Sequence, residues 1–444
     1  MMANIMSADT DTAHPGLLGR LFGLERHEYV AVAWSFVYFF CVLSAYYIIR
    51  PVRESMAVGS GADTIPYLFI GTFVATLVVT PVFGWVTSRF PRRVFLPWVY
   101  LFFIANILIF WAVFSTYVED DLDHVWLGRA FFVWLSVFNL FVVSVFWSFM
   151  ADIYTREQGR RLFGLITSGG SIGALAGSEL TSRYVTEIGF ENLFPISAAM
   201  LLIAILCIRR LRKWVVNEHR DGIDETAESS KPLGGGPLSG VTHVFGSSYF
   251  GGIVASSVIA SLLGTALYMF AAQLVEQQIA GTNERTQFFS DINVWANRFS
   301  LIGQMFLVRH VVKRFGIGVS LSLLPIVSIA SFILLAINPV LGVIAFLTAA
   351  RRALGFAFSK PTTDMLYSVA TSEEKYKTKN FIELAVYRFG DVVGTWSIKL
   401  MMGLGMAGVS IVMLPFAVIW AAVSLWLGRD YRRQARELKR SGIA

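Results

Sequence analysis

Charged residues are the scarcest feature of this 444-residue sequence. Asp, Glu, Lys and Arg together make up 15% of the chain, whereas an ordinary soluble domain has about 25%. A soluble chain of this length would need a larger polar surface, so most of its helices are expected to face lipid. Hydrophobic residues make up 55% of the chain, with 37 Phe and 12 Trp. The composition therefore predicts an integral membrane protein.

Cysteine and histidine are also rare. Cys41 and Cys207 both lie inside apolar runs, where cysteine usually behaves as a small buried hydrophobe. The six histidines show no metal-ligand spacing. We therefore expect no disulfide framework, no metal site and no cofactor. Residues 1–28 lack a basic region followed by a short apolar core and a cleavage site, so no removable signal peptide is predicted.

Long apolar runs dominate the rest of the chain. Runs of about 20 residues match the length of a membrane-spanning helix. The strands of a membrane β-barrel are about 10 residues long and alternate between apolar and polar residues, so helices are predicted instead. The sequence predicts an all-α polytopic membrane protein with twelve transmembrane helices in two six-helix bundles. The predicted spans are 30–49, 65–86, 94–114, 129–150, 163–182, 192–208, 249–275, 290–310, 319–337, 341–367, 381–401 and 404–427.

A polar segment divides these spans six and six. It contains Gly234-Gly235-Gly236 and is rich in Ser, Asp and Glu, so it cannot bury enough apolar surface to fold alone and is predicted to be a tether. The predicted organisation is a cytoplasmic N-terminal segment (1–28), an N-terminal bundle (29–216), a cytoplasmic linker (217–248), a C-terminal bundle (249–428) and a cytoplasmic tail (429–444).

Orientation follows from the placement of Lys and Arg. With the amino terminus inside, most Lys and Arg fall in cytoplasmic loops, as the positive-inside rule requires. The external loops carry only Arg50, Arg53, Arg129, Arg183 and Arg285. The net charge of +7 therefore reflects topology, and no nucleic-acid partner is expected. We predict a monomer in a bacterial inner membrane, with both termini cytoplasmic.

The two halves contain similar short motifs. Residues 151–154 read Ala-Asp-Ile-Tyr and residues 363–367 read Thr-Asp-Met-Leu-Tyr, each before a basic loop. Residues 84–93 resemble the signature loop of major facilitator transporters, with Ser88 in place of its usual Asp and Pro91 in place of its usual Gly. Major facilitators place the substrate between their halves near mid-membrane. Arg89 and Asp152 are therefore predicted gating residues.

Glycines recur at four-residue spacing in the fifth predicted span, at Gly169, Gly173 and Gly177. Such a face lets another helix pack closely, backbone to backbone. Structural packing is the favoured interpretation, although helix sliding during transport would use the same face.

Charges inside spans carry the strongest functional signal, because they are costly in lipid and usually face a cavity or a partner. Arg351 and Arg352 lie about 15 Å into the tenth span at 1.5 Å per residue. Arg352, Lys360 and Asp364 share one helix face, and Asp364 is expected to pair with Lys360. Arg388 and Asp391, three residues apart, are expected to pair as well.

The in-span and vestibule charges are mostly positive, so the cavity is predicted to bind an anion, since the arginine fork suits phosphate and carboxylate. The alternative is that these charges form structural ion pairs between helices. The predicted substrate-binding residues are Arg50, Arg53, Arg298, Arg351, Arg352, Lys360, Arg388, Asn297 and Gln304. The predicted gating or coupling residues are Glu54, Arg89, Asp152, Asp364, Glu383 and Asp391.

Three stretches resemble the nucleotide (ATP/ADP) translocases of plastids and intracellular bacteria, a family related to the major facilitators. Residues 47–54 and 61–66 read Tyr-Ile-Ile-Arg-Pro-Val-Arg-Glu and Gly-Ala-Asp-Thr-Ile-Pro. Residues 146–154 read Phe-Trp-Ser-Phe-Met-Ala-Asp-Ile-Tyr, and residues 360–367 read Lys-Pro-Thr-Thr-Asp-Met-Leu-Tyr. The resemblance implies exchange of charged nucleotides, with Arg50 and Arg53 at the family's basic pair and Asp364 at its acidic position.

The sequence departs from the family at three positions. Lys360 stands where the family has Asp, Thr363 where it has Lys, and Asp391 where it has Lys. The leading hypothesis is therefore a secondary active, alternating-access transporter of an organic or phosphorylated anion, with nucleotide exchange as one form.

Three alternative functions are less favoured. A proton-coupled major facilitator transporter of an unrelated solute would use Glu383 or Asp391 as its proton site. A membrane scaffold or sensor is disfavoured by the charges inside the spans. An enzyme is least expected, because the sequence contains no evident nucleophile–base arrangement, metal-ligand set or phosphate-cradling loop.

Overall fold

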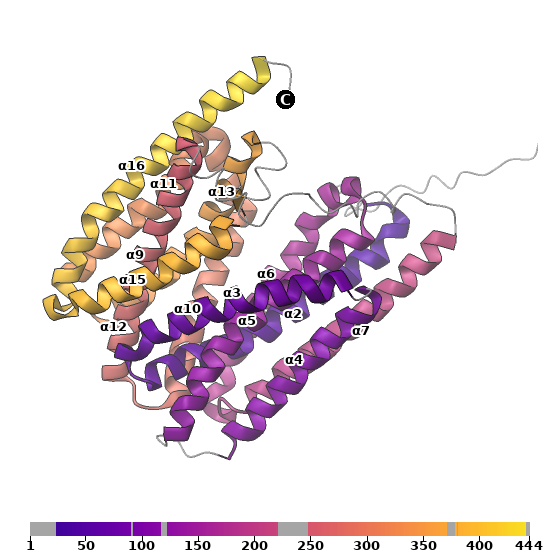
Figure 1. The fold of residues 1–444 in the computed structure, drawn as a ribbon, viewed down its shortest axis with the longest axis horizontal. Helices are drawn as coiled ribbons and strands as arrows, with labels where there is room; N and C mark the ends of the chain where they lie inside the picture. Colours follow the sequence, from indigo (N-terminus) through magenta and orange to yellow (C-terminus); the bar gives the residue numbers. More distant parts are fainter. Residues whose placement is uncertain are drawn as a thin grey trace, which may run out of the picture.

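The structure is a computed structural model that describes residues 24–89, 92–116, 122–220, 247–370, 378–379 and 381–440. In these ranges the chain is helical and contains no strand (Figure 1). The long helices are α2 (Tyr29–Gly59), α3 (Ile65–Arg89), α4 (Arg92–Phe114), α5 (Leu122–Ile153), α6 (Arg156–Ile188), α7 (Leu193–Arg220), α9 (Ser248–Gln278), α10 (Thr282–Ile302), α11 (Val308–Ile337), α12 (Leu341–Leu354), α15 (Tyr387–Met401) and α16 (Gly405–Arg440). The predicted linker lies largely outside the described residues.

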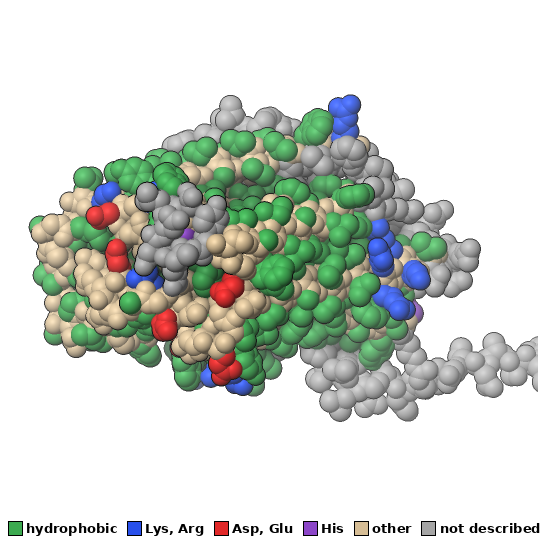
Figure 2. Space-filling view, turned by 90° about the horizontal axis from the view of Figure 1, so that it is seen from below, with side chains coloured by type: hydrophobic (Ala, Val, Ile, Leu, Met, Phe, Trp, Pro, Cys, Tyr) green, Lys and Arg blue, Asp and Glu red, His purple; other side chains and the backbone are tan. Residues whose placement is uncertain are grey.

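Nine helical segments of the described chain are long and apolar enough to cross a membrane. The predicted span 163–182 lies on α6 and most of 290–310 lies on α10, and neither helix is among the nine. Most of 381–401 and all of 404–427 fall within one continuous stretch, Tyr387–Arg440. Both α6 and α10 pack on other helices, mainly on α2, α12 and each other. Figure 2 shows broad hydrophobic areas on one face of the molecule, with few charged side chains among them.

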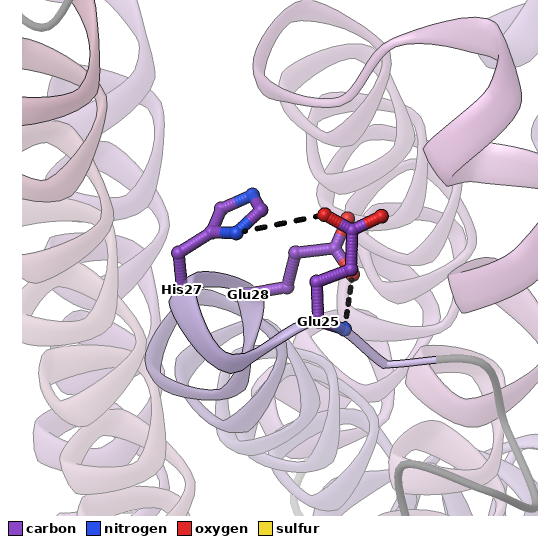
Figure 3. A group of neighbouring side chains, drawn as sticks. All are labelled: Glu25, His27 and Glu28. Atoms are coloured by element: carbon purple, nitrogen blue, oxygen red, sulfur yellow. Dashed lines mark hydrogen bonds and ion pairs between the residues drawn. The ribbon is translucent and has the colours of Figure 1, made fainter. Parts of the chain in front are cut away.

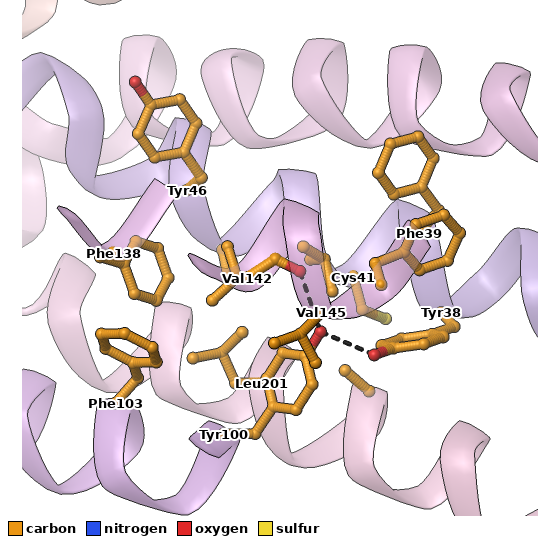
Figure 4. Close-up of a cluster of buried hydrophobic side chains, with 14 of the residues drawn as sticks. Tyr38, Phe39, Cys41, Tyr46, Tyr100, Phe103, Phe138, Val142, Val145 and Leu201 are labelled. Atoms are coloured by element: carbon orange, nitrogen blue, oxygen red, sulfur yellow. Dashed lines mark hydrogen bonds between the residues drawn. The ribbon is translucent and has the colours of Figure 1, made fainter. Parts of the chain in front are cut away.

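The first half of the chain has its own hydrophobic core, which runs from Leu24 to Leu211. Aromatic rings fill much of it (Figure 4). The hydroxyl groups of Tyr38 and Tyr100 lie 2.6 Å apart, and Tyr100 donates to the carbonyl of Val142 at 3.1 Å. These bonds satisfy the two buried phenols, so the core carries no cost from them as unpaired polar groups.

The glycine face of α6 packs directly on α2. A Cβ atom added to Gly177 would lie 2.7 Å from the carbonyl oxygen of Ser44, and one added to Gly169 would lie 2.5 Å from that of Phe36. The Ser44 hydroxyl also donates to the carbonyl of Gly173 at 2.9 Å. The structural interpretation of the glycine repeat is therefore confirmed.

The second half repeats this device between α9 and α15. A Cβ atom added to Gly390 would lie 3.0 Å from the Cβ of Ser261, and one added to Gly394 would collide with Thr265. The buried residues of this half form cores separate from that of the first, although Val58 and Ile65 of the first half also pack there.

Three π-helical turns interrupt helices of the second half: Gly303–Leu307, Gly355–Ser359 and Ile382–Val386. The first two lie side by side, since Gln304 Nε2 donates to the carbonyl of Phe356 at 3.2 Å. Such turns are rare and are frequent at functional sites. No π-helical turn occurs in the described residues before Gly303.

The halves are joined at one end, here called the closed end, which is the end remote from Tyr29 and Ser248. There Ser290 donates to the carbonyl of Ser178 at 2.7 Å, and Lys399 donates to that of Asp63 at 2.8 Å. Every hydrogen bond between described residues of the two halves lies in the portions of the helices that run toward this end. Toward the other end, here called the termini end, the halves spread apart (Figure 1).

Candidate functional site

Four arginines from the two halves lie at similar depths between them, and we call them the central arginine cluster. Arg50 and Arg53 come from α2, and Arg351 and Arg352 come from α12. Arg50 lies nine residues before the end of α2 and Arg352 eleven residues after the start of α12, so they are about 14 and 17 Å from the closed end at 1.5 Å per residue. The cluster therefore lies well inside the helices rather than at the closed end, and its depth in the membrane stays a prediction for Arg351 and Arg352.

The two arginines of α2 have different surroundings. Arg50 lies over the rings of Tyr46 and Tyr47, at 5.7 and 5.2 Å from their centroids. Its Nε is buried without a hydrogen-bond partner, and no described carboxylate lies within ion-pair distance of it. Arg53 instead pairs with buried Glu54 at 2.8 Å. The α2 pair therefore leaves one positive charge without a carboxylate partner.

The two arginines of α12 contact only neutral groups. Arg352 donates to Asn293 Oδ1 at 2.6 Å, and Arg351 donates to the carbonyl of Ala260 at 2.5 Å. Among the described residues, neither arginine has a carboxylate within ion-pair distance. Both side chains are partly exposed rather than enclosed.

The cluster is electropositive as a whole. Arg352 is within electrostatic range of Arg50 and Glu54 on the other half. Glu54 can neutralise one guanidinium, and Asp391 lies within electrostatic range of Arg351, which leaves at least two positive charges in excess. Positive charges held close together without enough carboxylates to neutralise them repel one another, so the arrangement favours binding of an anion.

Asp391 and Arg388 flank the cluster on α15. Arg388 Nη1 lies 3.8 Å from Asp391 Oδ2, which confirms the predicted pair. The other carboxylate oxygen of Asp391 accepts a hydrogen bond from Ser261 of α9. Asp391 is therefore a buried carboxylate with two local partners. The charge of Arg388 is paired with it.

Arg298 and Asn297 lie in the contact between the halves. Arg298 forms an ion pair with Glu179 of α6, and its guanidinium lies 5.2 Å from the Trp295 ring. Asn297 Nδ2 donates to the Ser178 hydroxyl at 3.4 Å. Glu179 was not predicted from the sequence, although a carboxylate inside a predicted span was an available signal. The structure places Arg298 in a bridge between the halves, away from the central arginine cluster.

Lys360, Asp364 and Glu383 belong to a separate ion-pair network toward the termini end. Lys360 Nζ lies 3.6 Å from Asp364 Oδ1, as predicted, and 2.5 Å from Glu383 Oε1. Lys379 completes the network at 2.8 Å from Asp364. The side chains of Lys360 and Glu383 are 52% and 41% exposed. Gln304 bonds to Ser300 and to the π-helical turn of α12, outside this network.

The remaining two predicted gating residues lie at the termini ends of their helices. Arg89 is exposed at the end of α3, with its guanidinium 5.5 Å from the Trp85 ring. Asp152 is exposed near the end of α5. Neither residue belongs to the central arginine cluster.

One cluster of His and Glu side chains lies at the start of the described chain (Figure 3). His27 Nδ1 is 3.7 Å from Glu25 Oε2, and the backbone N–H of Glu25 donates to Glu28. Buried Glu28 also accepts bonds from Arg161 at 2.9 Å and Gln158 at 3.0 Å. These bonds tie the beginning of α2 to α6, so we assign the cluster a structural role.

A helical membrane protein whose halves meet at one end, with a largely unpaired arginine cluster between them, has the architecture of a membrane transporter. The profile of the Major Facilitator Superfamily matches residues 33–378, and the chain belongs to this superfamily. Its sequence relatives include ADP,ATP carrier protein 1 of Chlamydia trachomatis serovar D, which is 22% identical over 480 residues, or 92% of this chain and 88% of the relative. ADP,ATP carrier protein 2 of Chlamydia pneumoniae is 21% identical over 93% of this chain and 91% of its own.

Solved structures show the same fold at low identity. The inward-open xylose transporter XylE from E. coli has a TM-score of 0.57 and 13% identity, over 89% of this chain and 95% of its own. The nucleoside transporter NupG has a TM-score of 0.54 and 14% identity, over 92% of this chain and 99% of its own. The predicted resemblance to nucleotide translocases is confirmed, and the matched proteins are transporters rather than enzymes.

Proposed function

We propose that this protein is an alternating-access carrier of an organic or phosphorylated anion, and that it exchanges nucleotides. The observation that carries the proposal is the central arginine cluster, in which Arg50, Arg351 and Arg352 contact rings, carbonyls and an amide but no described carboxylate. The names of the ADP,ATP carrier relatives support a nucleotide as the anion. A nucleotide carries several negative charges, which matches the excess of positive charge between the halves.

We also propose the twelve-span layout, with two six-helix bundles and both termini cytoplasmic in a bacterial inner membrane. Helices α6 and α10 have 33 and 21 residues, enough to cross a bilayer core about 30 Å thick. A turn at Met402–Leu404, followed by Gly405 at a φ of 69°, divides the last stretch into two spans. In this orientation the termini end is cytoplasmic, so we assign the structure to an inward-facing state, and we propose that the carrier acts as a monomer.

In the proposed cycle, substrate enters from the termini end and reaches the central arginine cluster. Arg50 and Arg53 contribute from one half, and Arg351 and Arg352 contribute from the other. Because the anion then bridges the halves, its binding stabilises a state in which both are close to it. If the carrier changes conformation without a bound anion, its guanidinium groups are brought together and repel one another. This repulsion favours exchange of one anion for another over uncoupled transport.

Uptake by proteoliposomes tests this proposal. Vesicles that contain the purified chain and are preloaded with ADP should take up labelled ATP, and empty vesicles should take up much less. Arg352→Gln should abolish most of this uptake. Arg210→Gln is a matched control, because Arg210 of α7 is exposed over the Trp34 ring at 5.9 Å and lies outside the central arginine cluster. No uptake of any nucleotide by folded wild-type protein would remove the nucleotide part of the proposal.

Proton-coupled transport of an unrelated solute is the second candidate, and Asp391 favours it. This carboxylate is buried, accepts a bond from Ser261 and lies 3.8 Å from Arg388, so protonation would weaken its hold on both α9 and Arg388. Glu383 is less suitable, because its exposed side chain is already paired with Lys360. Proton coupling predicts that a dissipated pH gradient stops accumulation, and that Asp391→Asn also stops it. Exchange without a gradient would exclude this candidate.

A further inference from the structure

A small cavity lies in the second half beside the central arginine cluster. It has a volume of about 60 Å³ and is bounded by α9, α10 and α12. Its polar lining consists of Tyr268, Thr348, Arg351 and Arg352, and the remaining lining is apolar. The Tyr268 ring also contacts the Phe69 ring of the first half at 5.7 Å between centroids. The cavity is therefore at the wall that faces the other half, where a substrate between the halves could reach it.

The unsatisfied polar atoms around this cavity can all donate hydrogen bonds. The Thr348 hydroxyl and the Nε of Arg351 have no hydrogen-bond partner, whereas the Tyr268 hydroxyl interacts with the Glu54 carboxylate of α2. Beside Arg352, the Nδ2 of Asn293 also lacks one, while its Oδ1 is held by that arginine. Buried polar atoms are normally paired, so three unpaired donors at one place need an explanation. An acceptor-rich group in the cavity would satisfy them together.

The charge at the cavity selects among acceptor-rich groups. Two guanidiniums line it, and an anion inside would be held by both. The apolar walls of Leu267 and Phe289 lower the local dielectric and strengthen that attraction. Glu54 of α2 interacts with the Tyr268 hydroxyl through a side-chain hydrogen bond, but Arg53 neutralises this carboxylate through its Oε1 at 2.8 Å. The lining therefore suits an oxyanion.

The volume limits the size of that oxyanion. Pockets for whole ligands measure about 300–1,000 Å³, so a nucleoside or a sugar does not fit here. A cavity of about 60 Å³ holds a few water molecules or one small group. A phosphoryl group has this size, carries up to three acceptor oxygens and points them in different directions, which matches donors that come from three helices.

We infer that this cavity is a phosphoryl subsite, which takes one terminal phosphoryl group while the rest of the substrate remains between the halves. The inference rests on the proposed function, because it names the part of the substrate that binds to the central arginine cluster. It adds Tyr268, Thr348 and Asn293 as specificity-determining residues. A single phosphoryl group is then sufficient for recognition, and inorganic phosphate binds to the same place.

Inorganic phosphate binding to the full-length protein in detergent tests the subsite without any transport step. A ligand that binds only the folded state raises the melting temperature, so phosphate should raise it in the wild-type protein. Thr348→Val keeps the side-chain shape and removes one donor, which should weaken phosphate binding roughly tenfold. Ala271→Leu fills the cavity and should abolish the shift. Thr80→Val is the control, because its hydroxyl bonds within α3 at 2.7 Å.

Two further ligands identify the source of the phosphoryl group. Adenosine, which has none, should give no shift that depends on Thr348. If Thr348→Val weakens the binding of AMP and of phosphate equally, free and organic phosphate share the cavity. If it weakens only the binding of AMP, the cavity binds organic phosphates alone. Either result supports a phosphoryl subsite. Unchanged binding of both ligands in Thr348→Val and Ala271→Leu would overturn the inference, and nucleotide exchange by those same variants would show that the proposed function stands without it.

Discussion

The ion pair between Glu179 and Arg298 offers a direct test of how the closed end is held. It joins α6 of one half to α10 of the other. Its side chains are 22% and 39% exposed, so solvent screens it and its contribution is about 1 kcal/mol, at the upper end for exposed pairs. If the pair forms only when this end is closed, Glu179→Gln shifts the equilibrium toward the state open at this end by about fivefold.

A buried serine in the same contact provides the assay. Ser290 is fully buried and donates to the carbonyl of Ser178 across the halves, so a cysteine at this position reacts with a thiol reagent only when the closed end opens. The native Cys41 and Cys207 are buried, with 2% and 0% of their surface exposed, so they should not react with the thiol reagent. In the Ser290→Cys background, Glu179→Gln should raise the labelling rate about fivefold.

Three further variants decide whether the effect belongs to the pair. Arg298→Gln should raise labelling by the same factor as Glu179→Gln, and the double variant should add little, because both remove one interaction. Arg183→Gln breaks a 3.2 Å contact with Glu179 inside α6 and should change the rate by less than about twofold. Fully additive effects, or unchanged labelling in both single variants, would refute the reasoning.

Three shorter predictions address the site and the packing. Arg352→Gln keeps a donor for its amide partner but removes the charge, and should raise the KM for anion uptake at least about tenfold. Gly177→Ala places a Cβ atom 2.7 Å from a backbone carbonyl and should lower stability by about 1–3 kcal/mol, seen as a lower melting temperature; Gly164→Ala, with nothing within 4 Å, should not. Glu383→Gln, with a 41% exposed side chain, should leave the melting temperature almost unchanged because exposed pairs contribute little.

The parts of the site that sequence could predict are those set by distance along one helix. The depth of Arg351 and Arg352 follows from counting residues, because the rise per residue is fixed. The pairs Lys360–Asp364 and Arg388–Asp391 follow from spacings of four and three, which bring side chains to one face. The glycine repeat of α6 likewise predicts a closely packed face from spacing along a single helix.

Contacts between different helices could not be predicted by counting residues along one helix. Arg298 has no acid at the spacing of a helical turn, and its partner Glu179 is 119 residues away in the chain. Lys360 likewise binds Glu383 from another element. The rotation and offset of packed helices decide these pairs, and a single sequence contains no direct record of either. The π-helical turns were missed for a related reason, because they depend on how neighbouring helices press on an otherwise regular segment.

Two of the three departures from the nucleotide translocase pattern, Lys360 and Asp391, gain a different meaning in the structure. Lys360 replaces an acid, but Glu383 and Asp364 lie beside it. Asp391 replaces a lysine, but it is held by Ser261 and lies beside Arg388. Both reversed charges therefore have local partners of opposite charge. The positive excess of the central arginine cluster comes from other residues, so the sign changes leave its attraction for an anion in place and alter instead the ion pairs that surround it.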